Sequence, residues 1–174
     1  MTAARLRNFK LVESLGDARI GLEARAQVDD HLDVKIWLRL LACSTQIEQH
    51  VQQHLRSRFG TTLARFDYLA QLERHPQGLR MTVLSRYLMV SGGNVTGLTD
   101  QLVKEGLVKR VDDADDRRSY LVQLSAKGRK SFGTMAAEHE QWLAALFKDL
   151  PSSEKEALYG QLGRLRVALR RPEA

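Results

Sequence analysis

The fold is decided by the stretch LRMTVLSRYLMVSGGNVTGLTDQLVKEGLVKRVDDADDRRSYLVQLS, residues 79–125. Within it, MTVLSRYL (81–88) and NVTGLTDQLVKEG (94–106) place apolar residues three and four positions apart, which predicts two short helices. The turn between them contains Ser91, a suitable N-cap for the second helix. Two helices joined by so tight a turn are typical of a helix-turn-helix.

The sequence pattern changes after Gly106, where a period of two replaces the helical period. LVKRV (107–111) and YLVQLS (120–125) predict two short strands. The polar segment DDADDRRS between them predicts a hairpin loop that is too long for a two-residue turn. The predicted fold class is therefore mainly α with a small β-hairpin wing, that is, a winged helix-turn-helix.

Longer helical segments flank this lobe. Residues 33–59 keep a helical apolar pattern over about 40 Å at 1.5 Å per residue, more than a small core covers, so we expect a partner helix from a second subunit. Gly60 ends this helix, and Thr61 or Thr62 caps the next, TLARFDYLAQLERH. Two more helices follow the hairpin, AKGRKSFGTMAAEHEQWLAALFKDL and SSEKEALYGQLGRLRVALRR.

These elements divide the chain into three predicted regions. Residues 60–125 form the winged helix-turn-helix lobe, and residues 33–59 together with 126–174 form a helical dimerisation region. Residues 1–32 have weak periodicity and balanced charge, so they form either a tail or a helix that clasps the dimer.

The composition indicates a polyanionic partner. Lysine and arginine outnumber aspartate and glutamate by 27 to 21, which gives a net charge of +6. The single cysteine, Cys43, allows no intramolecular disulfide and fits a reducing compartment. No segment approaches the ~20 apolar residues of a membrane span, and charges interrupt the first 27 residues, which argues against a signal peptide. We expect a cytoplasmic protein that does not bind membranes.

The second helix of a helix-turn-helix lies across the major groove of DNA, so the polar residues of 91–101 are candidates for DNA contact. Short polar side chains can donate to phosphate or read base edges, and the free N–H groups at the helix start favour a phosphate. The predicted groove-facing residues are Ser91, Gly92, Asn94, Thr96, Thr99 and Gln101, with Asp100 exposed beside them. The predicted phosphate contacts are Arg86, Lys109 and Lys127.

The hairpin tip carries Arg117 and Arg118 behind four aspartates. An arginine on a slender hairpin can enter the minor groove, where the potential is most negative. The aspartates cannot all face DNA, so we expect Asp113 and Asp116 to pair with an arginine and fix its direction. A solvated loop of mixed charge is the alternative that the pattern leaves open.

The stretch DDADDRRSYLVQLSAKGRKSF resembles the wing signature of the MarR family of bacterial regulators, roughly D-x-x-D-R-R-x-x-x-V-x-L-T-x-x-G. The matching residues are Asp113, Asp116, Arg117, Arg118, Val122, Leu124 and Gly128, and Ser125 stands where the family usually has threonine. VSGGNVTGLTDQLVKEGLVKR is similar to the recognition helix of that family and the chain that follows it. The resemblance extends over about residues 33–170.

The resemblance implies a homodimer, formed by the first helix and the last two, that binds a pseudo-palindromic DNA site. It also implies release from DNA by a small ligand, often aromatic or phenolic. The run Gly-Asn-Val-Thr-Gly-Leu (93–98) looks closest to a branch that regulates the breakdown of aromatic compounds. Some members of that branch respond to acyl-CoA thioesters.

Several further residues have a functional and a structural interpretation. His31, Trp37, Arg39 and Tyr68 are candidates for contact with an effector, whereas core or interface packing is the commoner role of aromatic residues. Cys43 is interpreted as a core residue rather than a peroxide sensor. His50 and His54 lie four apart, a spacing that can bind zinc, but nearby ligands are missing, so we expect no metal site.

The leading functional hypothesis is a MarR-like, ligand-responsive transcriptional regulator, acting as a repressor. A winged-helix protein-interaction or architectural module without a small-molecule effector is the alternative. The sequence shows no Ser-His-Asp order, no metal-binding cluster and no phosphate-binding loop. We therefore expect neither an enzyme nor a cofactor.

Overall fold

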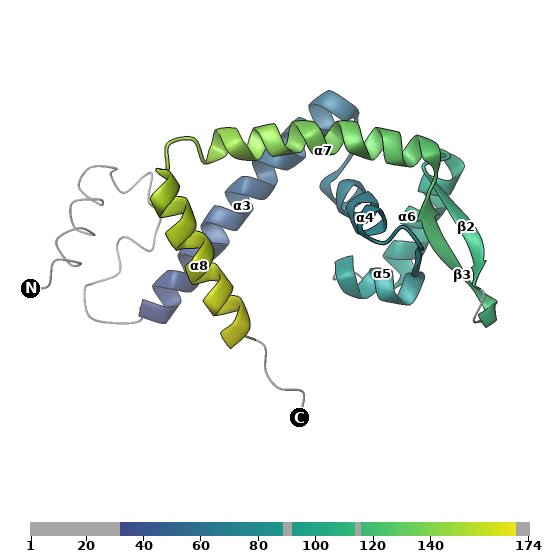
Figure 1. Cartoon of the computed structure of the whole chain (residues 1–174), viewed down its shortest axis with the longest axis horizontal. Helices are drawn as coiled ribbons and strands as arrows, with labels where there is room; N and C mark the ends of the chain where they lie inside the picture. Colours follow the sequence, from purple (N-terminus) through teal and green to yellow (C-terminus); the bar gives the residue numbers. More distant parts are fainter. Residues whose placement is uncertain (1–31, 89–91, 114–115, 170–174) are drawn as a thin grey trace, which may run out of the picture. The chain divides into compact units, whose positions relative to one another are not determined.

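The protein is described here from a computed structural model, which covers residues 32–88, 92–113 and 116–169; for Gly92 and residues 116–118 only the backbone is described (Figure 1). The chain divides between His54 and Leu55 into two compact units. The expected tail or clasp, residues 1–32, lies almost wholly outside the described residues.

The first described element is α3, Leu32–Phe59, a helix of 28 residues that agrees with the predicted segment. Gly60 follows at a φ of 61°, a left-handed conformation that ends a helix readily. Val51 and Leu55 are buried, whereas a set of large apolar side chains near the start of the helix is exposed: Leu32, Val34, Ile36, Trp37, Leu38 and Leu41. Cys43 is exposed as well, so its interpretation as a core residue is wrong for the single chain.

The second unit contains the predicted lobe, whose helices lie together beside the sheet (Figure 1). Its helices are α4 (Leu63–Arg74), α5 (Met81–Leu88) and α6 (Gly92–Lys104), and its strands are β1 (Leu79–Arg80), β2 (Val108–Asp113) and β3 (Asp116–Leu124). Of the two threonines proposed to cap α4, Thr62 is the N-cap, and its side chain accepts a hydrogen bond from the Arg65 amide at 3.3 Å. Gly106, at a φ of 73°, follows the end of α6.

The sheet has three antiparallel strands in the order β1-β3-β2, so sequence analysis missed one strand. β1 has only two residues, and it is defined by its pairing with β3, where Leu79 lies opposite Val122. The predicted long hairpin loop is also wrong. Because β2 continues to Asp113 and β3 begins at Asp116, only two residues separate the strands, and Asp113 pairs with Asp116.

Two helices follow the sheet, α7 (Ala126–Leu146) and α8 (Ser152–Ala168). The Ser125 hydroxyl caps α7 by accepting a hydrogen bond from the Gly128 amide at 2.9 Å. α8 has no buried residue, and its exposed side chains include Leu158, Tyr159, Leu162 and Val167.

The start of α7 packs directly on the backbone that leads from α6 into the sheet. Ser125 donates from its amide to the Leu107 carbonyl at 3.0 Å and from its hydroxyl to the Gly106 carbonyl at 2.6 Å. A Cβ atom on Gly128 would lie 1.8 Å from the Leu107 carbonyl oxygen. Only glycine therefore fits at position 128, which gives a packing reason for the glycine in the wing signature.

Aromatic rings join α7 to α4 and to the end of α3. The Phe66 ring lies 5.4 Å from the Phe132 ring and 4.8 Å from the His139 ring, measured between centroids. The Trp142 ring lies 6.4 Å from His139 and 6.2 Å from Phe59. Burial among these rings lowers the pKa of His139, against an opposing effect of Asp67, so the neutral imidazole is the favoured form.

Two kinds of feature are absent from the described residues. None of their helices is both long enough and apolar enough to cross a membrane. In the same part of the chain, no three His, Cys, Asp or Glu side chains are grouped so that they could hold a metal ion. The His50 and His54 rings lie 4.5 Å apart on α3.

Gly128→Ala is expected to lower the free energy of unfolding by about 1–3 kcal/mol, the usual cost of overpacking. The Cβ would press on the Leu107 backbone, which cannot rotate away as a flexible side chain could. Gly133→Ala is the matched control on the same helix, because a Cβ there meets nothing within 4 Å. This variant should be stabilised by up to about 1 kcal/mol, because alanine favours a helix more than glycine does. Urea denaturation of both variants measures the difference, and equal effects would contradict the close-packing argument.

Candidate nucleic-acid interface

The orientation of α6 is set by its buried side. Val95, Thr99 and Leu102 are fully buried, and they lie on one face of the helix at three- and four-residue spacing. Thr99 was expected on the exposed side because its side chain is short and polar. That expectation is wrong, because Thr99 occupies the helical position between two core residues.

The Thr99 hydroxyl is satisfied inside the lobe. It donates to the Val95 carbonyl oxygen at 2.7 Å and shares a hydrogen bond of 2.6 Å with the Tyr68 hydroxyl on α4. Tyr68 is itself fully buried, so its side chain belongs to the core. Burial raises the pKa of Tyr68 to about 12, although its hydrogen bond with Thr99 opposes the shift. The contact therefore ties α6 to α4 through neutral groups.

The opposite side of α6 carries the polar residues that the DNA hypothesis requires. Asn94, Thr96 and Gln101 are exposed, as is Lys104 at the end of the helix. Ser91 lies outside the described residues, and of Gly92 only the backbone is described, as the first residue of α6. The contact of these residues with DNA stays a prediction.

One polar contact joins α6 to the wing. The Arg110 guanidinium on β2 donates to the carboxylate of Asp100 on α6. Its central carbon also lies 5.0 Å from the centroid of the Tyr120 ring on β3. The hydrogen bond to Asp100 is the largest of the effects that raise the pKa of Arg110, so this side chain remains cationic.

A second contact lies near the tip of the wing. Asp113 is buried, and its Oδ2 accepts hydrogen bonds from Arg80 Nε at 2.6 Å and from the Ser119 hydroxyl at 3.2 Å. A buried carboxylate needs such partners, because its desolvation is otherwise costly. The expected wing pairing thus includes an arginine of β1 that sequence analysis did not consider. The side chains of Asp116, Arg117 and Arg118 lie outside the described residues, and their predicted roles stay predictions.

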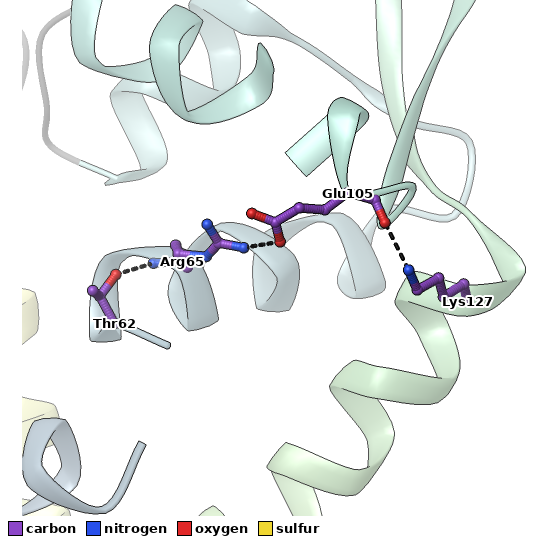
Figure 2. Close-up of polar contacts among 4 residues, drawn as sticks. All are labelled: Thr62, Arg65, Glu105 and Lys127. Atoms are coloured by element: carbon purple, nitrogen blue, oxygen red, sulfur yellow. Dashed lines mark hydrogen bonds and ion pairs between the residues drawn. The ribbon is translucent and has the colours of Figure 1, made fainter. Parts of the chain in front are cut away.

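Two contacts also hold the C-terminal end of α6, as Figure 2 shows. The Arg65 guanidinium on α4 reaches the carboxylate of Glu105, the residue that follows α6. The backbone carbonyl of Glu105 accepts a hydrogen bond from Lys127 Nζ at 2.8 Å. Lys127 therefore has an internal partner in the structure, whereas the other two predicted phosphate contacts, Arg86 and Lys109, are simply exposed.

Each effector candidate that the structure describes is placed within its own unit of the chain. Trp37 and Arg39 are exposed on α3, two positions apart, so they cannot face the same side of the helix. Tyr68 is engaged with Thr99, and His31 lies outside the described residues. The effector contacts of these residues stay predictions.

Sequence reasoning missed Arg80, Arg110 and Glu105 because each binds a residue on another element. A signal existed for Thr99, since Val95, Thr99 and Leu102 follow the helical period. No local pattern marks the pairing of Arg80 with Asp113, 33 residues away.

Comparison with known proteins agrees with this geometry. Residues 59–119 match the sequence profile described as "MarR family". The chain is also 31% identical over 120 residues to the transcriptional activatory protein BadR of Rhodopseudomonas palustris, a match that covers 68% of each protein. The chain belongs to the MarR family.

Solved structures of MarR-family proteins have the same fold. A regulator from Silicibacter pomeroyi is 29% identical with a TM-score of 0.66, and the match covers 79% of this chain and 95% of that one. Sco3205 from Streptomyces coelicolor, solved in complex with DNA, has a TM-score of 0.70 at 22% identity, over 85% and 95% of the two chains. The predicted winged helix-turn-helix, and a DNA-binding transcriptional regulator rather than an enzyme, are confirmed for this MarR-family protein.

Tyr68→Phe is expected to lower the free energy of unfolding by about 0.5–1.5 kcal/mol, the usual net value of one hydrogen bond. The Thr99 hydroxyl would keep its bond to the Val95 carbonyl, so no donor is left without an acceptor. Tyr159→Phe is the matched control, because the Tyr159 side chain is 83% exposed. Urea denaturation of both variants at neutral pH gives the comparison.

A comparison of wild type with Tyr68→Phe at rising pH tests the pKa of Tyr68. A folded-state pKa of about 12 against an ordinary 10.0 means that the phenol contributes its stability fully below pH 10. This contribution is lost as the pH rises from 10 towards 12, so the stability difference between wild type and Tyr68→Phe should shrink there. A difference that stays constant over this interval would contradict the assignment.

Proposed function

We propose that this MarR-family protein is a transcriptional repressor that binds a pseudo-palindromic duplex as a homodimer. The observation that carries the proposal is the orientation of α6, whose apolar face is buried while Asn94, Thr96 and Gln101 are exposed. These side chains would read base edges in the major groove, and Gly92 at the start of the helix would offer an amide to phosphate.

The wing would add contacts on the neighbouring groove. The backbone of Arg117 and Arg118 belongs to β3 next to the end of the hairpin, a place from which a side chain can enter the minor groove. Arg86, Lys109 and Lys127 would contact phosphate, the last of them after release from the Glu105 carbonyl. A net charge of +6 favours such a complex.

Exposed apolar side chains support the homodimer. Six large apolar residues near the start of α3 and four on α8 are exposed in the single chain, although such residues are usually buried. We propose that a second copy covers them. Dimerisation would place two recognition helices at a fixed separation, which must be about 34 Å for successive turns on one side of DNA.

The proposed effector is a small aromatic acid or its CoA thioester, a proposal supported by the resemblance of residues 93–98 to regulators of aromatic breakdown. Binding would favour dimers whose recognition helices have the wrong separation, and a shift in population is enough to release DNA. Trp37 and Arg39 on α3 stay candidates for contact, each on its own side of the helix. The protein would act in the cytoplasm, where it meets DNA.

Fluorescence anisotropy tests this proposal. A labelled duplex from the DNA upstream of the gene of this protein is compared with a random duplex across a salt series, before and after addition of aromatic acids and their CoA thioesters. We expect tight preference for the upstream duplex and its loss with one compound class. Equal affinity for both duplexes would favour an architectural or protein-interaction module. Transcription in vitro from the same DNA then distinguishes repression from activation.

Gln101→Ala is expected to weaken binding to the upstream duplex by about 1–3 kcal/mol, the usual value of one good base contact. Binding to random duplex should change little, because phosphate contacts carry no sequence information. Gln141→Ala on α7 is the control, since this residue is also exposed but distant in sequence from the lobe. An unchanged preference in Gln101→Ala would remove this residue from the proposed interface.

A further inference from the structure

Asp100 is the one acidic residue in α6, and it lies on the proposed DNA side. Its side chain is 58% exposed, and the adjacent Gln101 is exposed too. A carboxylate that faces phosphates is repelled by them, and like charges placed together in an interface weaken binding strongly. The helix that is proposed to approach DNA therefore contains a group that opposes the approach.

The structure supplies a partner for this carboxylate. The guanidinium of Arg110 reaches across from β2 to Asp100, and it is less exposed than the carboxylate, at 34% against 58%. The ring of Tyr120 on β3 lies 5.0 Å from the guanidinium carbon and restrains it from the other side. Stacking on an aromatic ring leaves the guanidinium edge free to donate, so both contacts can form together.

The pair adds little to the attachment of α6. The helix is already held to α4 by the buried contact between Thr99 and Tyr68 and by its apolar face. Ion pairs with this degree of exposure contribute little to folding stability, because water screens them. A role in DNA binding therefore explains the arrangement better than a role in folding.

We propose that Arg110 is a positioning residue that acts on DNA binding through Asp100, whose charge it neutralises, rather than by touching DNA itself. The inference rests on the proposed function, because it requires α6 to face the duplex. It makes Asp100 and Arg110 one unit: the cation is needed only because the carboxylate is present.

The test compares wild type with Arg110→Gln, Asp100→Asn and the double variant. Anisotropy with the upstream duplex gives affinity and its salt dependence, and urea denaturation checks that all four proteins are folded. Arg110→Gln should weaken binding about tenfold or more, because the carboxylate loses its partner. The double variant should recover to within about threefold of wild type, with an unchanged salt slope, because no phosphate contact has been removed.

Two results would overturn the inference. A double variant that binds as weakly as Arg110→Gln, with a salt slope reduced by about one, would show that Arg110 contacts a phosphate directly. Asp100→Asn that binds the upstream duplex more weakly than wild type would show that the carboxylate itself makes a favourable contact, as with a cytosine amino group.

Gln101→Ala, measured in parallel, separates this inference from the proposed function. If that variant loses preference while the double variant fails to recover, α6 reads DNA and the assignment of Arg110 is wrong. If wild type shows no preference and Gln101→Ala has no effect, the proposed function fails, and the inference fails with it.

Discussion

The hydrogen bond between Tyr68 and Thr99 is the constraint on which the proposed DNA-facing surface of α6 depends. Both side chains are fully buried, and 2.6 Å separates their hydroxyl oxygens. A buried hydroxyl that loses its partner is costly, so α6 cannot rotate about its axis without breaking this contact and exposing Val95 and Leu102. Because the side of α6 that carries Val95, Thr99 and Leu102 is held in the core, the residues on its opposite side are exposed.

The wing depends on a similar requirement, because a buried charged group also needs hydrogen-bond partners. The carboxylate of Asp113 is buried at the end of β2, where Arg80 and Ser119 bind it. Because β1 supplies Arg80, this two-residue strand does more than widen the sheet: it stabilises the aspartate that begins the hairpin tip. The strands can then run close together through a segment rich in aspartate, which would otherwise favour a solvated loop.

Local patterns in the sequence were sufficient for the helices. MTVLSRYL gave the bounds of α5, and Gly60 with the threonine pair 61–62 marked the end of α3 and the start of α4. The errors share a physical cause, which is that long-range pairs decide the outcome. β1 exists only through its pairing with β3, and the aspartates of the tip were read as a loop because the partner Arg80 lies 33 residues earlier. Thr99 was predicted to be exposed for another reason: its polar side chain was considered, and its position on the apolar side of the helix was not.

The core contacts and the proposed DNA contacts therefore lie on different sides of α6. Thr99 and Gln101 are two positions apart, so they face different directions; the first is held in the core and the second is exposed. Substitutions among the exposed polar residues of α6 leave the contacts of Val95, Thr99 and Leu102 unchanged. Under the proposed function, DNA preference can thus change without cost to the fold, provided that any new charge on the exposed side has a partner, as Asp100 has in Arg110.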